Sequence, residues 1–311
     1  MADVNYIFLL SLTIIVIGYL VKKLKIITEE NGKIVAKVIF NITLPAVILK
    51  VTSSLEFKPT LIILPLINIA YGFFMAAIGL IVFRKRERKE KGLLLISLIG
   101  FNVAHFSFPL VEGIWGEEGL QYIALIDAGN AFTIFVLCYL VGSIFSFQNN
   151  SGEQGINLKE TGKRLLTSAP LLSYILAMTL SLSSVALPLF CMDLLDILSR
   201  ANTALSLLLL GIYLNFRFER SEWNTILKVL SLRYSFGLFI GLMLFFLLPP
   251  TQFEHLFRII VAISLILPVG LAVIPFSVEF EYDQRLINMI VTLTIIISFI
   301  LIWIMIIILD G

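Results

Sequence analysis

The sequence predicts an all-α polytopic membrane protein with ten transmembrane helices, and three observations support this prediction. Of the 311 residues, 59% are hydrophobic and 14% are charged, whereas an ordinary soluble domain has roughly 45 to 50% and 25%. Ten apolar runs approach the length of about 20 residues that a membrane-spanning helix needs. Basic residues gather in alternate connections between these runs.

The ten runs follow one another along the whole chain. A transmembrane β-barrel would instead show alternating segments of about ten residues, so helices are favoured. We expect no cleaved signal peptide, because no basic residue precedes the first run and no small-residue cleavage pattern follows it. The runs cover residues 6–21, 34–49, 60–83, 92–111, 120–145, 169–187, 190–214, 232–248, 256–280 and 286–308.

The loops predict an orientation. Under the positive-inside rule, the basic connections face the cytoplasm, and both termini of a protein in the cell membrane then lie outside. We interpret the basic run 84–91 as a topology anchor and not as a site for nucleic acid or anionic lipid. The basic residues assigned to cytoplasmic loops are Lys22, Lys23, Lys25, Lys33, those of 84–91, Lys159, Lys163, Arg164, Arg217, Arg220, Lys228 and Arg233.

A hydrophilic linker divides the chain into two groups of five spans. The predicted parts are a first five-helix repeat (1–145), a cytoplasmic linker (146–168) and a second five-helix repeat (169–311). Because an odd number of spans in each half inserts the halves with opposite orientation, we expect an inverted repeat.

A shift of 166 residues tests this expectation. It aligns Asn102 with Pro268 and Pro109 with Pro275, so that each half has the same seven-residue spacing between these positions. A chance alignment of prolines remains an alternative.

Both aligned positions lie near the middle of a span, in the runs 92–111 and 256–280. Proline removes an amide donor and crowds the carbonyl one turn back, and non-helical backbone at this depth is tolerated only inside protein or beside a cavity. A broken span presents a half-helix N-terminus, which suits an anionic group such as a carboxylate. The sequence therefore predicts a site at the midplane, with a simple proline kink in each helix as the alternative.

Polar side chains lie close to the first break. Asp127 is about seven residues into the fifth run, and Asn130 shares its helix face. His105 shares a face with Asn102 in the fourth run. A carboxylate at this depth is either protonated or partnered. Asp127 and His105 are therefore candidates for proton or cation coupling, and the alternative for each is an interhelical hydrogen bond.

Two further runs contribute polar residues at depth. Asn41 precedes Pro45 in the second run, and Asn202 lies in the seventh. Both are candidate substrate-binding residues. Asp196 and Arg200 are spaced to pair along one helix face, which favours a structural role.

The order and spacing of four segments resemble the auxin efflux carrier family of membrane transporters, which includes plant PIN-type carriers and short prokaryotic members. The segments are "ITEENGKIVAKVIFNITLPAVIL", "GFNVAHFSFPLVEGIWGEEGLQYIALIDAGN", "LSRANTALSLLLLGIYL" and "LPVGLAVIPFSVEFEYDQRLI". The resemblance covers nearly the whole chain.

This resemblance implies two inverted five-helix repeats, related to the bile-acid/sodium symporter architecture, with broken helices four and nine crossing at the substrate site. By position, Asn102 is similar to the site asparagine of the family, and Pro268 and Pro275 to its second break. Asp127 and Asn130 are similar to the polar pair of span five. Phe101 replaces the proline that plant members have before the asparagine, and their long loop is missing, so a small carboxylate is expected instead of auxin.

The competing classes find little support. No second acidic cluster, His-Glu-x-x-His helix or glycine-rich nucleotide loop is present, so we expect no enzyme, no metal site and no cofactor beyond coupling to H+ or Na+. The expected function is secondary transport of a small organic anion by alternating access, with a channel on the same scaffold as the alternative. The lipid bilayer is the expected surrounding, nucleic acid is not a partner, and the resemblance gives a hint of a homodimer.

Overall fold

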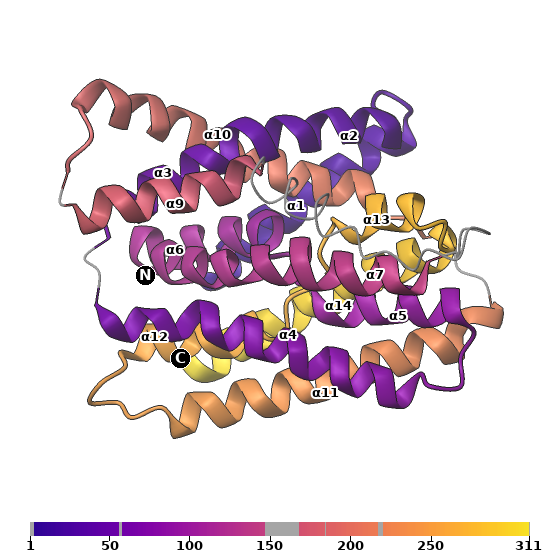
Figure 1. The fold of residues 1–311 in the computed structure, drawn as a ribbon. Helices are drawn as coiled ribbons and strands as arrows, with labels where there is room; N and C mark the ends of the chain where they lie inside the picture. Colours follow the sequence, from indigo (N-terminus) through magenta and orange to yellow (C-terminus); the bar gives the residue numbers. More distant parts are fainter. Residues whose placement is uncertain (1–2, 56–57, 147–167, 184, 217–219, 311) are drawn as a thin grey trace.

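The fold is a bundle of helices whose axes run mostly along one direction (Figure 1). The computed structural model describes residues 3–55, 58–146, 168–183, 185–216 and 220–310. In these ranges no strand forms, and the one extended pairing is an isolated bridge between Phe101 and Val269. Residues 147–167 of the expected linker lie outside the described residues, and so do the expected loop residues Lys159, Lys163, Arg164 and Arg217.

Helices occupy all ten predicted apolar runs. They include π-helical segments (η1, η3, η4) and short 3-10 segments (η2, η5). In chain order they are α1 (Val4–Lys23), α2 (Glu29–Val38), η1 (Ile39–Thr43), α3 (Leu44–Ser53), η2 (Pro59–Ile62), α4 (Ile63–Val82), α5 (Arg88–Ile99), η3 (Val103–Ser107), α6 (Phe108–Phe132), η4 (Thr133–Cys138), α7 (Tyr139–Phe145), α9 (Ala169–Leu182), α10 (Leu189–Tyr213), η5 (Arg220–Glu222), α11 (Trp223–Leu247), α12 (His255–Ser264), α13 (Val273–Glu279) and α14 (Gln284–Asp310).

Among the described residues, seven helical segments are long and apolar enough to cross a membrane, and two further apolar helices are shorter. The longest segment, Val103–Phe145, contains the last part of the fourth predicted run and the whole of the fifth. Gly116 interrupts it with φ 64°, a backbone conformation that glycine adopts without steric cost. The all-helical polytopic class is therefore confirmed, whereas the count of ten spans stays a prediction.

The two chain termini lie at the same end of the bundle (Figure 1). The opposite end holds the connection from α1 to α2 and the connection from α4 to α5, together with α13. An even number of crossings returns the chain to the side on which it began, so this placement agrees with ten spans.

Two prolines explain the π-helical turns near the centre. A proline has no N–H for the carbonyl four residues earlier, and its ring crowds that carbonyl. Asn41 precedes Pro45 by four residues and lies in η1, and His105 precedes Pro109 by four residues and lies in η3. The widened turns relieve the crowding, and such turns are frequent at functional sites.

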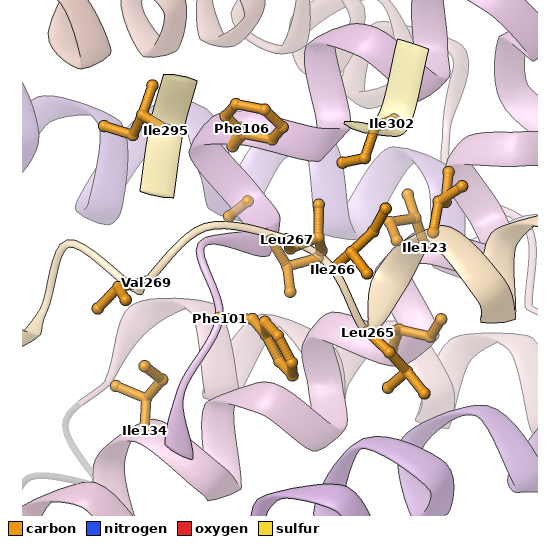
Figure 2. Packing of buried hydrophobic residues seen from close by; sticks show 14 of the residues in the cluster. Phe101, Phe106, Ile123, Ile134, Leu265, Ile266, Leu267, Val269, Ile295 and Ile302 are labelled. Carbon is orange, nitrogen blue, oxygen red and sulfur yellow. The ribbon is translucent and has the colours of Figure 1, made fainter. Parts of the chain in front are cut away.

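Two helices unwind completely at the centre of the bundle. The chain is non-helical between α5 and η3, and again between α12 and α13. The unwound segments cross as a short antiparallel pair: Phe101 bridges Val269, and the N–H of Asn102 donates to the carbonyl oxygen of Pro268 at 2.8 Å. Figure 2 shows Phe101 and the segment from Leu265 to Val269 at this crossing, surrounded by apolar side chains.

One expectation is wrong. The eighth run was placed at 232–248, and Arg233 at its start was counted among the cytoplasmic loop residues, but α11 begins at Trp223 and contains Arg233 on a buried face. Charged residues lower the mean hydropathy of the first turns, so the apolar run alone marks only the second part of the helix.

Helices α1 and α10 approach each other closely because glycine lies on both. A Cβ atom added at Gly211 would overlap the carbonyl oxygen of Ile15, and one added at Gly18 would overlap the carbonyl oxygen of Leu208. Small residues that let helix backbones touch replace the hydrophobic effect as a source of association in lipid.

Replacement of Gly211 by alanine should therefore force α1 and α10 apart, at a cost of about 1–3 kcal/mol. The expected result is a lower midpoint of thermal unfolding in detergent. Ile197→Ala on the outward face of the same helix, where the residue is 67% exposed, is the matched control. An equal effect of the two substitutions would contradict the close packing.

Candidate functional site

A cavity of about 590 Å³ lies beside the crossing of the two unwound segments. Its wall is formed by α2, η1 and the first residue of α3, by the segment from Phe101 into η3, by α6 and η4, by one residue of α9 and two of α10, and by residues between 270 and 279. Most lining side chains are apolar. The polar ones are Lys33, Lys37, Asn41, Asn102, His105, Asp127, Asn130, Tyr213 and Glu279.

The cavity has a mouth and a floor. Lys33, Lys37 and Asn41 recur every four residues along α2 and η1 and are exposed. At the floor, Asn102 is 2% exposed and Asp127 is 6% exposed. The exposed lining residues extend from Asn41 near the centre of the bundle to Lys33 in α2, which begins at the same end of the bundle as α13 (Figure 1), and the buried lining residues adjoin the crossing.

Asn102 has a free donor at the floor. Its main-chain N–H is taken by Pro268, whereas its buried side-chain nitrogen Nδ2 has no hydrogen-bond partner among the described residues. The residue directly precedes the helix that begins at Val103, so the first free amides of that helix lie next to its side chain. The predicted substrate-binding position thus has an unpaired donor beside a helix N-terminus.

Asn130 lines the same cavity, but its side chain binds protein. The Phe101 N–H donates to its Oδ1 at 3.0 Å, and its Nδ2 donates to the Phe101 carbonyl oxygen at 2.9 Å. The side-chain amide of Asn130 therefore makes the two hydrogen bonds that a neighbouring β-strand would make to the backbone of Phe101, which lies outside the helix. Without it, two buried backbone groups would lack partners.

Asp127 is held by two donors. Asn130 Nδ2 donates to Oδ1 at 3.3 Å, and the Tyr174 hydroxyl donates to Oδ2 at 3.0 Å. Tyr174 comes from α9, which belongs to the other predicted half. A continuous set of hydrogen bonds therefore runs from α9 through Asp127 and Asn130 to the unwound backbone at Phe101.

The remaining predicted residues divide into those that line the cavity and those that do not. His105 and Pro275 line it, as does Asn41, whose Nδ2 donates at 2.8 Å to the Lys37 carbonyl oxygen of its own helix. Asn202 does not: it is 1% exposed and accepts a hydrogen bond of 3.0 Å from the Thr43 hydroxyl. Pro109 and Pro268 also do not line the cavity but shape the backbone beside it.

Arg233 holds the crossing from the side of α11. The residue is 0% exposed, and its guanidinium donates to main-chain carbonyl oxygens of both unwound regions. Its carbon Cζ also lies 4.4 Å from the centre of the Phe101 ring. The acceptors and distances are Ser97 (3.2 Å), Leu98 (3.0 Å), Gly100 (2.9 Å), Leu267 (2.9 Å) and Pro268 (3.0 Å).

An ion-pair cluster lies toward the end opposite the mouth. The predicted pair of Arg200 and Asp196 forms at 2.6 Å, and Lys50 of α3 joins it, 2.8 Å from Asp196 and 3.1 Å from Glu117. The cluster thus connects α3, α10 and the second part of α6. The Thr203 hydroxyl adds a bond of 2.8 Å between α10 and Glu112 of the first part of α6.

Sequence reasoning missed six polar residues at or near the site: Lys33, Lys37, Tyr174, Tyr213, Arg233 and Glu279. Lys33 was assigned to a cytoplasmic loop. Tyr174 carried a signal, since a hydroxyl deep in an apolar helix needs a partner. Arg233 carried one as well, because an arginine beside an apolar run is rarely buried without a function.

The chain matches a known family over almost its full length. The family model described as "Membrane transport protein" covers residues 7–306. The chain belongs to this family. It is therefore a multi-pass membrane transporter and not an enzyme, and the resemblance to the auxin efflux carrier family is confirmed.

Two archaeal members of the family are similar to it in sequence. An uncharacterized transporter of Methanocaldococcus jannaschii is 30% identical over 217 residues, which is 67% of this chain and 68% of the relative. An uncharacterized transporter of Methanothermobacter thermautotrophicus is 27% identical over 214 residues, 67% of each chain.

Substitution of Asn130 by alanine is expected to destabilise the transporter because it leaves the N–H and the carbonyl of Phe101 unpaired. Each orphaned buried group costs about 1–3 kcal/mol. The midpoint of thermal unfolding in detergent should fall clearly. Asn41→Ala, which removes a bond only within one helix, serves as the control, and a loss no larger than that of this control would refute the strand-replacing role of Asn130.

Proposed function

We propose that this transporter is a secondary carrier of a small organic anion, with the carboxylate bound at the floor of the cavity. The observation that supports this most directly is the unpaired Nδ2 of Asn102. A buried donor without a partner is rare and calls for a ligand. The adjacent helix N-terminus favours negative charge, and its free amides point toward the same region.

The surroundings of the floor suit a small acid with an apolar body. Phe101, Ile134 and Phe135 contribute apolar wall, and Lys33 and Lys37 place two cations at the mouth. Positive charge at the entrance of a cleft raises the local concentration of anions. A volume of about 590 Å³ is within the usual range for small-molecule sites.

Alternating access is proposed over a channel because the cavity has a mouth at one end. The exposed lining lysines Lys33 and Lys37 lie on the α2 side of the cavity, and the bonds of Lys50, Asp196 and Glu117 join helices toward the other end. A carrier closed on one side fits this arrangement, whereas a conducting channel would need a path past these bonds.

The contact between Asn102 and Pro268 supports the proposed inverted repeats, 1–145 and 169–311. These two positions are equivalent under the shift of 166 residues, and they are hydrogen-bonded to each other. In a structure with a local two-fold axis, equivalent residues touch only beside that axis. An antiparallel pair has such an axis, so the crossing of the two broken helices fits a pseudo-two-fold relation between the halves.

We also propose that the mouth faces the cytoplasm and both termini face outside the cell. Lys22, Lys23 and the basic run 84–91 lie in or beside connections at the end of the mouth. The positive-inside rule assigns this end to the cytoplasm. The state described by the structure is then open to the inside.

Counterflow in proteoliposomes tests the carrier and its site together. Protein loaded with an unlabelled dicarboxylate should accumulate the labelled acid with saturable kinetics. In Asn102→Ala the apparent affinity should fall by about 10- to 100-fold, because a hydrogen bond to a charged group contributes about 1.5–3 kcal/mol.

Asn68→Ala is the matched control for this substitution. The Asn68 nitrogen Nδ2 is also buried without a partner, but the residue does not line the cavity. Conductance that neither saturates nor exchanges would point to a channel, and equal transport by the two variants would remove Asn102 from the site.

Asp127 is proposed to couple transport to protons through its bonds to Tyr174 and Asn130. The Asp127→Asn substitution keeps the shape and an acceptor for the Tyr174 hydroxyl but removes the exchangeable charge. We expect the variant to fold and to lose accumulation driven by a pH gradient, even where it retains counterflow. Uphill transport that follows the pH gradient as in the unmodified protein would exclude Asp127, and dependence on a Na+ gradient would identify the other coupling ion.

A further inference from the structure

The surroundings of Arg233 have the composition of a cation site. Its hydrogen-bond acceptors among the described residues are all main-chain carbonyl oxygens, from Ser97, Leu98, Gly100, Leu267 and Pro268. No carboxylate pairs with it in the part of the chain that the structure describes. Five oxygens from two unwound segments converge on one buried positive group.

The helix geometry explains why a cation is needed there. α5 ends at Ile99, so the carbonyls of Ser97 and Leu98 belong to its last turn and have no N–H partner further along the helix. α12 ends at Ser264, and its chain continues unwound to Leu267 and Pro268. Two helix C-terminal ends with negative partial charge therefore approach the same point.

Unwound carbonyls at half-helix C-terminal ends are the usual ligands of a mobile coupling cation in transporters with broken helices. We propose that the guanidinium of Arg233 is a tethered cation that permanently fills such a carbonyl site, so that the crossing binds no Na+. All three nitrogens of the guanidinium donate hydrogen bonds, and the planar group reaches carbonyl oxygens of both unwound segments. A small spherical ion would bind the same oxygens by coordination.

The proposal has a consequence for the anion. Phe101 packs against the guanidinium on one side of the crossing and also contributes to the cavity wall. The positive charge of Arg233 is therefore separated from the cavity floor by Phe101 alone, and it is present at every Na+ concentration. An anion at Asn102 meets this fixed charge, and its binding needs no added metal ion. This consequence rests on the proposed anion transport, whereas the cation site itself does not.

Chemical rescue tests the site without any transport substrate. Arg233→Ala removes the tethered cation and leaves a space of the shape of guanidinium. Because a ligand that binds the folded state raises its apparent stability, low millimolar guanidinium chloride should raise the unfolding midpoint of this variant in a saturable manner. The unmodified protein, whose site is filled, should show no such rise, and urea at the same concentrations should have no effect.

Arg258→Ala is the control arginine variant. Arg258 also lies over an aromatic ring, with Cζ 5.0 Å from the centre of Phe245, and donates to one main-chain carbonyl oxygen at 3.3 Å, but no ring of carbonyls surrounds it. Guanidinium should not stabilise this variant. Absence of saturable rescue in Arg233→Ala, or equal rescue in both variants, would overturn the proposal.

If Arg233→Ala does not fold, a second pair of variants tests whether the carbonyl site needs a cation. Arg233→Lys keeps a positive charge, and Arg233→Met keeps a long side chain without charge. The charge requirement predicts that the lysine variant unfolds at a clearly higher temperature than the methionine variant. Equal stability of the two, or greater stability of the methionine variant, would show that the carbonyls need no cation.

The transport readout separates this proposal from the previous one. Anion counterflow by the unmodified protein should be the same in choline and in Na+ buffers, should fall about tenfold or more in Arg233→Ala, and should recover in guanidinium. Rescue of stability without any anion counterflow would leave the cation site standing and remove the carrier. Counterflow in the unmodified protein without rescue of the variant would support the carrier and overturn the cation site.

Discussion

The fold depends on the pairing of backbone polar groups at the point where two helices unwind inside an apolar bundle. A freed N–H or carbonyl in such surroundings costs several kcal/mol unless it finds a partner. Here the partners are protein groups. Arg233 takes carbonyls of both segments, Asn130 takes both backbone groups of Phe101, the Thr294 hydroxyl accepts from the Val269 N–H at 3.2 Å, and the Ser298 hydroxyl donates to the Ile266 carbonyl at 2.7 Å.

This pairing also defines what remains for a ligand. With the backbone groups of the crossing paired, the side-chain nitrogen of Asn102 is a buried polar atom without a partner among the described residues, and its residue lines the cavity. Under the proposed function, binding and structure use different groups of neighbouring residues. Asn130 lines the cavity and holds the backbone, while Asn102 uses its main-chain N–H for the crossing and has a side-chain nitrogen without a partner, which is the proposed contact of the substrate.

Two connections across the bundle bear on the proposed alternating access. Tyr174 of α9 binds Asp127 of α6 near the floor, and Lys50 of α3 binds Glu117 toward the opposite end. A movement that opens the far end must break the second bond. The first bond joins α9 to α6 beside the proposed substrate position, so under the proposed coupling role of Asp127 a change in its charge would act on the contact between these two helices.

The sequence by itself determined the helical class, nearly all helix positions, the two breaks and the polar residues beside them. Those features depend on local composition: apolar length selects spans, and proline disrupts the turn before it, as the π-helical turns before Pro45 and Pro109 show. Only the tertiary structure decided which polar group serves which purpose. Arg233 and its acceptor Gly100 are 133 residues apart in the chain, and Tyr174 and Asp127 are 47 apart. A hydrogen bond between such distant residues leaves no periodic signal, because its geometry exists only after the helices have packed.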